Sequence, residues 1–145
     1  MLDRSIAAGH FIVPTAAYRD EGTSYHYAPA SDYIDIPTAA ELSAAFDAIS
    51  MPHVQGKTWT TDAIYRETRD GLAKRRAEGC ITVEMECASV MAVGRFRKKA
   101  VYQFLYAEDC LDSVEWDPRI MGKQPATAYE GYLDVALECA IRVKG

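Results

Sequence analysis

The chain has 145 residues, of which 49% are hydrophobic, so it is long and apolar enough to form one globular domain and is not a disordered tail. Its 21 acidic and 16 basic residues give a formal net charge of −5, a balance that repels phosphate polymers and argues against nucleic-acid binding. No apolar run approaches the roughly 20 residues that cross a bilayer, and the first residues lack a signal-peptide profile, so we expect a cytoplasmic protein.

The first third of the chain predicts a strand followed by a helix. Residues 10–17 form a short apolar run, and Pro14 within it predicts an edge strand, a bulge or a strand end. Residues 38–41 (TAAE) have the pattern of a capping box, in which the threonine and the glutamate satisfy the first N–H groups of a helix. Apolar residues then recur at helical spacing until Met51 and Pro52 end the helix.

The middle of the chain predicts a second strand and two helices of different character. Residues 54–61 alternate with period two, which is typical of a strand. Residues 66–77 are mostly charged and predict a surface helix that ends at Gly79. Residues 85–96 are almost free of charge, so we expect that helix to be buried on most sides.

The last third predicts the clearest strand and the clearest helix. Residues 101–107 (VYQFLYA) form a β-branched and aromatic run typical of a strand covered on both faces. In the final helix, a predicted core-facing stripe consists of Tyr129, Tyr132, Leu133, Ala136, Leu137, Ala140 and Ile141. Strands that alternate with helices predict an α/β layered fold with parallel strand pairing.

The side chains most often used for metal binding show no ligand spacing. We expect reduced, mostly buried thiols, packing or surface imidazoles, and no metal site. The residues concerned are Cys80, Cys87, Cys110 and Cys139, together with His10, His26 and His53.

Three polar clusters follow predicted strands, at the ends where α/β sheets bind ligands. They are residues 19–24 (RDEGTS), residues 60–62 (TTD) and residues 108–109 (ED). Each cluster also fits ordinary loop and cap chemistry, with Arg19 paired to a nearby acid. Their shared position at strand ends favours a binding site.

Two carboxylates flank a methionine where an apolar run turns into a helix of small residues. Glu84, Met85 and Glu86 occupy this position, where a buried charge needs donors to replace its lost water. A carboxylate accepts two hydrogen bonds from a vicinal diol, and a thioether covers a sugar face, so this motif suits a ribose. The alternative interpretation is that the two acids simply begin a helix, whose dipole favours negative charge at that end.

Four segments, taken in order, look like motifs of the nucleoside phosphorylase family, which includes uridine phosphorylase and hexameric purine nucleoside phosphorylase. They are residues 18–27 (YRDEGTSYHY), 59–67 (WTTDAIYRE), 83–88 (VEMECA) and 106–109 (YAED). The resemblance covers nearly the whole chain and matches only the carboxyl-terminal part of that family's longer domain. It implies a three-layer α/β/α sandwich, here truncated, with a mainly parallel or mixed sheet.

The resemblance also implies a reaction, the phosphorolysis of a nucleoside to a free base and ribose 1-phosphate. It assigns Glu86 to the ribose 2′ and 3′ hydroxyls, Met85 to the sugar face and Glu84 to support of the same site. Asp109 stands where purine-specific relatives carry the acid that protonates the base, a role that requires the protonated form and hence a raised pKa.

The base preference stays open between purines and uridine. Asp62, Ile64 and Tyr65 lie in the segment that resembles the family's base pocket, but Ile64 replaces a phenylalanine that stacks on the base in many relatives. Asp109 favours purines, whereas residues 21–24 lean toward the uridine branch.

The glycine-rich loops that bind phosphate in this family have no counterpart in residues 1–145, which we interpret as a partial domain lacking the amino-terminal phosphate-binding part. We expect no cofactor, with inorganic phosphate as co-substrate, and either a homo-oligomer or complementation by an amino-terminal fragment. Two further hypotheses are a nucleosidase of the same superfamily, which uses water, and a non-catalytic remnant that binds or oligomerises through an exposed sheet edge.

Overall fold

The computed structural model describes residues 1–143, so the last two residues of the predicted domain lie outside the described part. The strands are β1 (Phe11–Asp20), β2 (Tyr33–Asp35), β3 (His53–Thr61), β4 (Cys80–Glu84) and β5 (Leu105–Tyr106). The helices are α1 (Ala39–Ala48), α2 (Arg69–Ala77), α3 (Cys87–Phe96) and α4 (Ala126–Ala140), with 3-10 turns η1 (Thr23–His26) and η2 (Ile64–Arg66).

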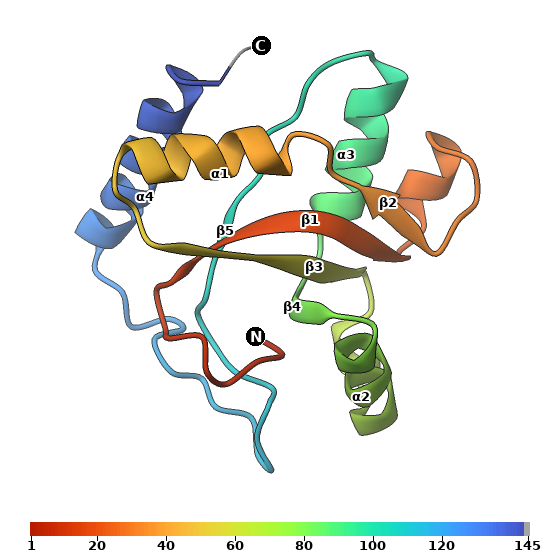
Figure 1. The fold of residues 1–145 in the computed structure, drawn as a ribbon. Coiled ribbons are helices and arrows are strands. Elements are labelled where there is room, and N and C mark those ends of the chain that lie inside the picture. The colour runs from red at the N-terminus through yellow and green to blue at the C-terminus, as the bar shows by residue number, and fades with distance from the viewer. Residues whose placement is uncertain (144–145) are drawn as a thin grey trace.

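The sheet is mixed and has β1 and β3 at its centre (Figure 1). Its order is β2-β1-β3-β4, with β5 added to β1 on the same side as β2. The strands β1, β3 and β4 run parallel, whereas β2 and β5 are antiparallel to β1. The predicted α/β fold with a mixed sheet is confirmed.

Strand β1 contains the irregularity that Pro14 predicts. Pro14 pairs with Gly56, and the register then shifts before Ala17 pairs with Thr58. Proline has no N–H to donate to a ladder, so a bulge at this point lets an interior strand tolerate it. The strand also extends to Asp20, three residues beyond the predicted run.

Helices cover both faces of the sheet and produce three layers. The main core joins Phe11 and Val13 of β1 to α1, α3 and α4, and Phe46 at its centre is fully buried. Ile12, between these two β1 residues, faces the opposite layer, because side chains alternate along a strand. That layer contains α2 and the amino-terminal segment, whose Leu2 packs with Trp59 and Cys80.

The run 101–107 is wrong as a seven-residue strand. Only Leu105 and Tyr106 pair, with Ile12 and Phe11, and they pair antiparallel rather than parallel. Residues 101–106 are only half-buried, although their sequence is typical of a strand covered on both faces. In residues 1–143 this run pairs with β1 alone. Without a second neighbouring strand, its other edge forms no backbone hydrogen bonds that would lengthen it.

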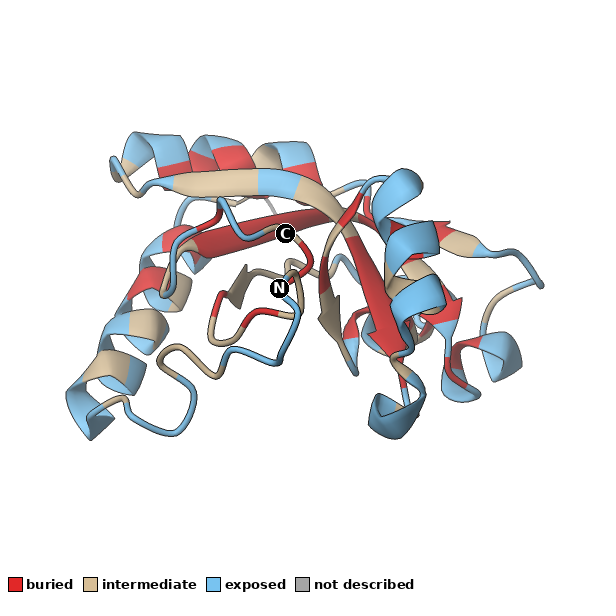
Figure 2. Cartoon of the chain, turned by 90° about the horizontal axis from the view of Figure 1, so that it is seen from below, coloured by how far each residue is buried: buried red, intermediate tan, exposed pale blue. Residues whose placement is uncertain are grey.

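The predicted core faces of the last two helices are also partly wrong. Helix α4 buries Val135 and Cys139, whereas Leu133 and Leu137 of the predicted stripe are 60% and 55% exposed. Figure 2 shows the outer turns of α4 as largely exposed. Helix α3 buries Cys87, Ala88, Met91 and Ala92 but leaves Phe96 61% exposed, so it is buried on one side only.

The start of α1 and the two ends of α2 show how local side chains set helix boundaries. Thr38 makes no cap bond, because its hydroxyl donates to the carbonyl oxygen of Val101 at 2.5 Å, so the predicted capping box is wrong. The side chain of Thr68 accepts from the N–H of Gly71 and begins α2. Gly79, with a φ of 91°, ends α2 as predicted.

Among the described helices, none has the length and apolar character needed to cross a membrane.

Two glycine-to-alanine substitutions test how closely α3 packs on residues 99–101. A Cβ at Gly94 would overlap the Val101 side chain and approach the Lys99 carbonyl oxygen at 3.3 Å, whereas a Cβ at Gly131 meets nothing within 4 Å. We expect Gly94→Ala to lower the free energy of unfolding by about 1–3 kcal/mol through overpacking. Gly131→Ala should raise it by about 0.5–1 kcal/mol through helix propensity. Urea denaturation followed by circular dichroism measures both, and a shift in the same direction would contradict the packing.

Candidate functional site: the β4–α3 junction

Three parallel strands end at the same edge of the sheet, which brings two of the predicted polar clusters together. Asp20 of β1 pairs with Thr61 of β3, and Thr60 pairs with Glu84 of β4. The backbone N–H of Gly22 donates to the Asp62 carboxylate at 3.2 Å and joins the first cluster to the second. This edge is where ligands bind in open α/β sheets.

The Glu84 carboxylate holds the β4–α3 junction together. Its Oε1 accepts from the hydroxyls of Thr58 at 3.2 Å and Thr60 at 2.5 Å, both on β3. Its Oε2 accepts from the backbone N–H groups of Glu86 at 2.8 Å and Cys87 at 2.6 Å, which open α3. One side chain therefore ties the end of a strand to its neighbour and to the first turn of the next helix.

Thr60 extends this network and leaves Glu84 no free acceptor for a ligand. The Thr60 hydroxyl accepts from the backbone N–H of Ala88 at 3.1 Å while it donates to Glu84. Burial raises the pKa of the Glu84 carboxyl, although the hydrogen bonds from Thr60, Cys87, Glu86 and Thr58 oppose that shift. Glu84 therefore contributes to the predicted site by holding the backbone of Glu86 and Cys87 in place.

The neighbouring acid lies in solvent, which corrects the expectation that Glu86 is buried. Glu86 is exposed, makes no side-chain cap bond at the start of α3, and stands beside Met85, which is 44% exposed. Neither residue lines the cavity between α2 and the amino-terminal segment or the one between α1 and α4. The reason is the strand period: Glu84 follows Cys80 and Thr82 on one face, and the chain then turns outward.

The cluster after β1 contains a buried arginine and a buried glutamate that do not pair with each other. Arg19 is 3% exposed and donates to the Ser24 hydroxyl at 2.8 Å and the Pro29 carbonyl oxygen at 2.6 Å, and its guanidinium lies over the Tyr25 ring. The expected ion pair between Arg19 and an acid is therefore wrong, because backbone carbonyls take the place of the carboxylate.

Glu21 joins the end of β1 to α3 one helical turn beyond Glu86. Its Oε2 accepts from the Ser24 N–H at 2.9 Å and the Ser89 hydroxyl at 2.8 Å, whereas its Oε1 is buried without a partner. Burial alone would raise the pKa of Glu21, but the hydrogen bonds from Ser24, Ser89 and Thr23 lower it. Its carboxylate is thus held ionised at the edge of the site.

The predicted base-pocket residues lie on the surface at the start of η2. Asp62 is exposed and bonded to Gly22, while Ile64 and Tyr65 are 53% and 99% exposed. They form a solvent-exposed surface next to the carboxyl ends of β1 and β3. A ligand at this edge would cover apolar and aromatic surface that is now in water.

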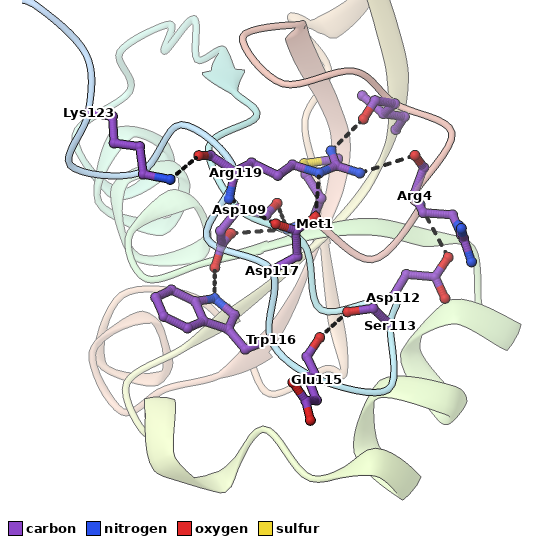
Figure 3. A network of polar contacts seen from close by, with 11 residues as sticks. Met1, Arg4, Asp109, Asp112, Ser113, Glu115, Trp116, Asp117, Arg119 and Lys123 are labelled. Atoms are coloured by element: carbon purple, nitrogen blue, oxygen red, sulfur yellow. Dashed lines mark hydrogen bonds and ion pairs between the residues drawn. The ribbon is translucent and has the colours of Figure 1, made fainter.

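Asp109 belongs to a different part of the molecule from Glu86. Because β5 is antiparallel to β1 and pairs with its first residues, the chain leaves β5 at the amino end of β1. The Asp109 carboxylate forms an ion pair with the amino group of Met1 at 3.4 Å and accepts from the Trp116 indole N–H at 2.8 Å (Figure 3). The third polar cluster therefore does not share the strand ends with the other two.

The loop after Asp109 nevertheless reaches the segment that follows η2. Burial raises the pKa of Glu67, and the negative charge of Asp109 raises it further, which places the two carboxyls within range of each other. Arg69 donates to the Val114 carbonyl oxygen at 3.2 Å and fixes the same loop to α2. The base-pocket segment and the predicted acid are thus linked through Glu67 and Arg69.

Several contributing contacts were not predicted from the sequence. Thr60 belongs to the predicted cluster 60–62, but the fully buried Thr58 was not named, although a strand face that carries hydroxyls toward a neighbouring carboxylate could have revealed it. Nothing in the sequence pairs Glu21 with Ser89 or Asp109 with Trp116, because those contacts join separate elements.

The chain belongs to the phosphorylase superfamily, whose sequence profile it matches over residues 1–127. This range contains the β4–α3 junction, η2 and Asp109, so the family assignment includes every predicted site residue.

Solved structures share this fold at low sequence identity. The AMP nucleosidase from Bacteroides thetaiotaomicron is similar with a TM-score of 0.68 and 23% identity, over 95% of this chain and 54% of that one. The purine nucleoside phosphorylase from Toxoplasma gondii in complex with immucillin-H gives 0.74 and 18%, over 96% and 58%. A P. knowlesi homologue of P. falciparum PNP gives 0.72 and 18%, over 97% and 57%. The chain therefore spans little more than half the length of these structures.

The two acids of the junction should behave in opposite ways when each is shortened to alanine. Glu84→Ala leaves two hydroxyls and two helix N–H groups without their acceptor, so we expect a loss of about 2–4 kcal/mol in the free energy of unfolding. Glu86→Ala removes an exposed side chain without a cap bond and should change it by less than about 0.5 kcal/mol. Chemical denaturation measures both, and an equal loss in the two variants would contradict the structural assignment of Glu84.

Proposed function

We propose that this chain carries the ribose- and base-binding half of a nucleoside-cleaving site. The observation that supports this most strongly is the β4–α3 junction. There a fully bonded Glu84 holds the turn from which the free carboxylate of Glu86 and the thioether of Met85 project at the strand ends. An exposed carboxylate can accept both hydroxyls of a ribose, and the neighbouring methionine can pack on the sugar.

The reaction proposed is the transfer of the pentosyl group of a purine nucleoside or uridine to inorganic phosphate, which gives a base and ribose 1-phosphate. Cleavage of the N-glycosidic bond moves negative charge into the departing base, and Asp109 as a general acid would neutralise it. Asp109 lies within electrostatic range of Glu67, which follows η2, and this connects it with the predicted base-pocket segment. The four free, buried cysteines fit a reducing cytoplasm.

The second candidate function is hydrolysis, in which water takes the place of phosphate. Glycine-rich phosphate loops have no counterpart in this chain, and one of the similar structures is an AMP nucleosidase. A non-catalytic module that binds or oligomerises is the third candidate, and the exposed Leu133, Leu137 and Ile141 support it.

Product analysis distinguishes the three candidates. The chain is incubated with inosine, adenosine and uridine, with and without inorganic phosphate. Ribose 1-phosphate that forms only with phosphate is the result we expect. Free ribose would favour the nucleosidase, and the absence of both cleavage and calorimetric binding for all three nucleosides would favour the non-catalytic module.

Two variants separate binding from chemistry in this assay. Glu86→Gln should weaken nucleoside binding about tenfold or more, because hydrogen bonds to a charged acceptor contribute about 1.5–3 kcal/mol. Asp109→Asn should lower turnover about 10²–10⁴-fold with little change in binding, because it removes a proton donor. Glu130→Gln, an exposed acid on α4, is the matched control and should change neither. An equal loss of binding and turnover in Asp109→Asn would reject the acid role.

The partner we propose is the remainder of the phosphorylase fold, supplied by an amino-terminal fragment, with a second copy of the chain as the alternative. It would cover the uncovered surface, which we define as residues 101–106 together with the exposed stripe Tyr129, Leu133, Leu137 and Ile141 of α4. The stacked rings of Tyr106 and Tyr132, 4.0 Å apart, join the two parts of this surface. In the sequence both parts have the pattern of buried elements.

We expect the isolated chain to self-associate through the uncovered surface, because an open strand edge and an apolar patch favour pairing with another chain. Leu133→Glu combined with Leu137→Glu should shift it toward the monomer in sedimentation velocity at matched concentrations. Asp70→Asn, an exposed acid on α2 in the opposite layer of the fold, should leave the association unchanged. If the wild type is a monomer at high concentration, or if the leucine substitutions leave its association unchanged, the uncovered surface is not the site of self-association.

A further inference from the structure

A cavity lies beside the loop that follows Asp109, and no residue of the β4–α3 junction lines it. It measures about 420 Å³ and lies between the amino-terminal segment, α2 and residues 111–114. We call it the arginine pocket, after Arg4, Arg69 and Arg76 in its walls. Neither Asp109 nor any residue of the junction lines it, so it is separate from the proposed nucleoside site.

The arginine pocket has more cationic than anionic side chains in a chain whose net charge is −5. Asp112 is the only acid among the lining residues in the described chain, and it accepts from the Arg76 guanidinium and from the backbone N–H of Arg4 at 3.1 Å. Asp3 is also nearby. The hydroxyl and N–H of Ser5 lower its pKa, with a smaller effect from the positive charge of Arg76.

The three guanidinium groups retain unused donors. Each guanidinium has five N–H groups. The Arg69 group donates to the Val114 carbonyl oxygen and the Arg76 group to Asp112, whereas within residues 1–143 the Arg4 guanidinium donates to no other group. In Figure 3 no dashed line leaves the Arg4 guanidinium, while its backbone N–H reaches Asp112. Donors of this kind are suited to the bidentate recognition of phosphate.

The floor of the pocket is apolar and fixed in the core. Leu2 is 1% exposed and belongs to the same cluster as Trp59, against which Leu72 and Leu111 pack. A ligand here would meet cations at the rim and hydrocarbon beneath, and a cavity of this size falls within the range of small-molecule sites.

We propose that the arginine pocket binds a small phosphorylated molecule that carries an apolar or aromatic group. The phosphate contacts Arg4 and Arg69, and the apolar group lies on the leucine floor. Because the lining loop continues to Asp109, an occupied pocket also holds that loop against α2. The proposal is independent of the nucleoside reaction, since neither pentosyl transfer nor binding at Glu86 is needed for it.

Isothermal titration calorimetry with phenyl phosphate tests the proposal, because this probe has a phosphate and a ring but no ribose. We expect saturable binding that weakens about tenfold or more in the double variant Arg4→Gln, Arg69→Gln, as charge-assisted hydrogen bonds are lost. The double variant Arg97→Gln, Lys99→Gln, at the exposed end of α3, removes the same two positive charges elsewhere and should change the affinity less than about twofold.

Two further probes assign the binding to the phosphate and to the ring. Inorganic phosphate should bind more weakly than phenyl phosphate and lose affinity in the Arg4→Gln, Arg69→Gln variant, while phenol should not bind measurably. Thermal unfolding confirms that each variant folds. The proposal is overturned if phenyl phosphate does not bind at millimolar concentration, or if its affinity is the same in the wild type and the Arg4→Gln, Arg69→Gln variant. Equal effects of the Arg97→Gln, Lys99→Gln variant and the Arg4→Gln, Arg69→Gln variant would also overturn it, because they would indicate attraction to net charge alone.

Discussion

The geometry of the candidate site depends on the carboxylate of Glu84. This side chain ends β4, bonds laterally to two threonines of β3 and accepts the first N–H groups of α3. A carboxylate in such a place is stabilised by donors and by the positive end of the helix, and burial without them would cost several kcal/mol. Because Glu84 is fixed, the chain turns outward at the next two residues, so Met85 and Glu86 face solvent at the edge where three parallel strands end.

The result is one wall of a site rather than an enclosed cleft. Glu86 and the η2 residues Ile64 and Tyr65 are all exposed to solvent. The chain spans 54–58% of the length of similar solved structures. Its uncovered surface consists mainly of apolar and aromatic residues, as protein interiors do. Under the proposal above, the remainder of the fold would close a cleft over this surface and desolvate the Glu86 carboxylate.

The sequence predicted local structure better than long-range pairing. Strand β3, the end of α2 at Gly79 and the bulge near Pro14 all follow from periods and turn chemistry that operate over a few residues. The run 101–107 and the outer stripe of α4 were predicted as buried because their sequences have that pattern. Within residues 1–143 no element covers them fully, and an apolar pattern cannot reveal whether its partner is present.

The candidate site was predicted as a set of residues but not as an arrangement. The motif around Met85 was recognised, yet burial was assigned to Glu86 when strand alternation with Cys80 and Thr82 places Glu84 inward. Asp109 was expected beside the other polar clusters, but β5 is antiparallel, and strand direction is not encoded in a seven-residue apolar run. Contacts such as Glu21 with Ser89 join elements that only the tertiary structure brings together.

The central claim is that Met85 and Glu86 form the sugar-binding wall, and methyl-labelled methionine tests it most directly. The chain has five methionines, which serve as separate reporters in a methyl-detected NMR titration with inosine. We expect the Met85 methyl resonance to shift on saturation and to stop responding in Glu86→Gln, while Met51 and Met91 stay unchanged. A titration in which no methionine moves, or in which another methionine moves instead of Met85, would contradict the account.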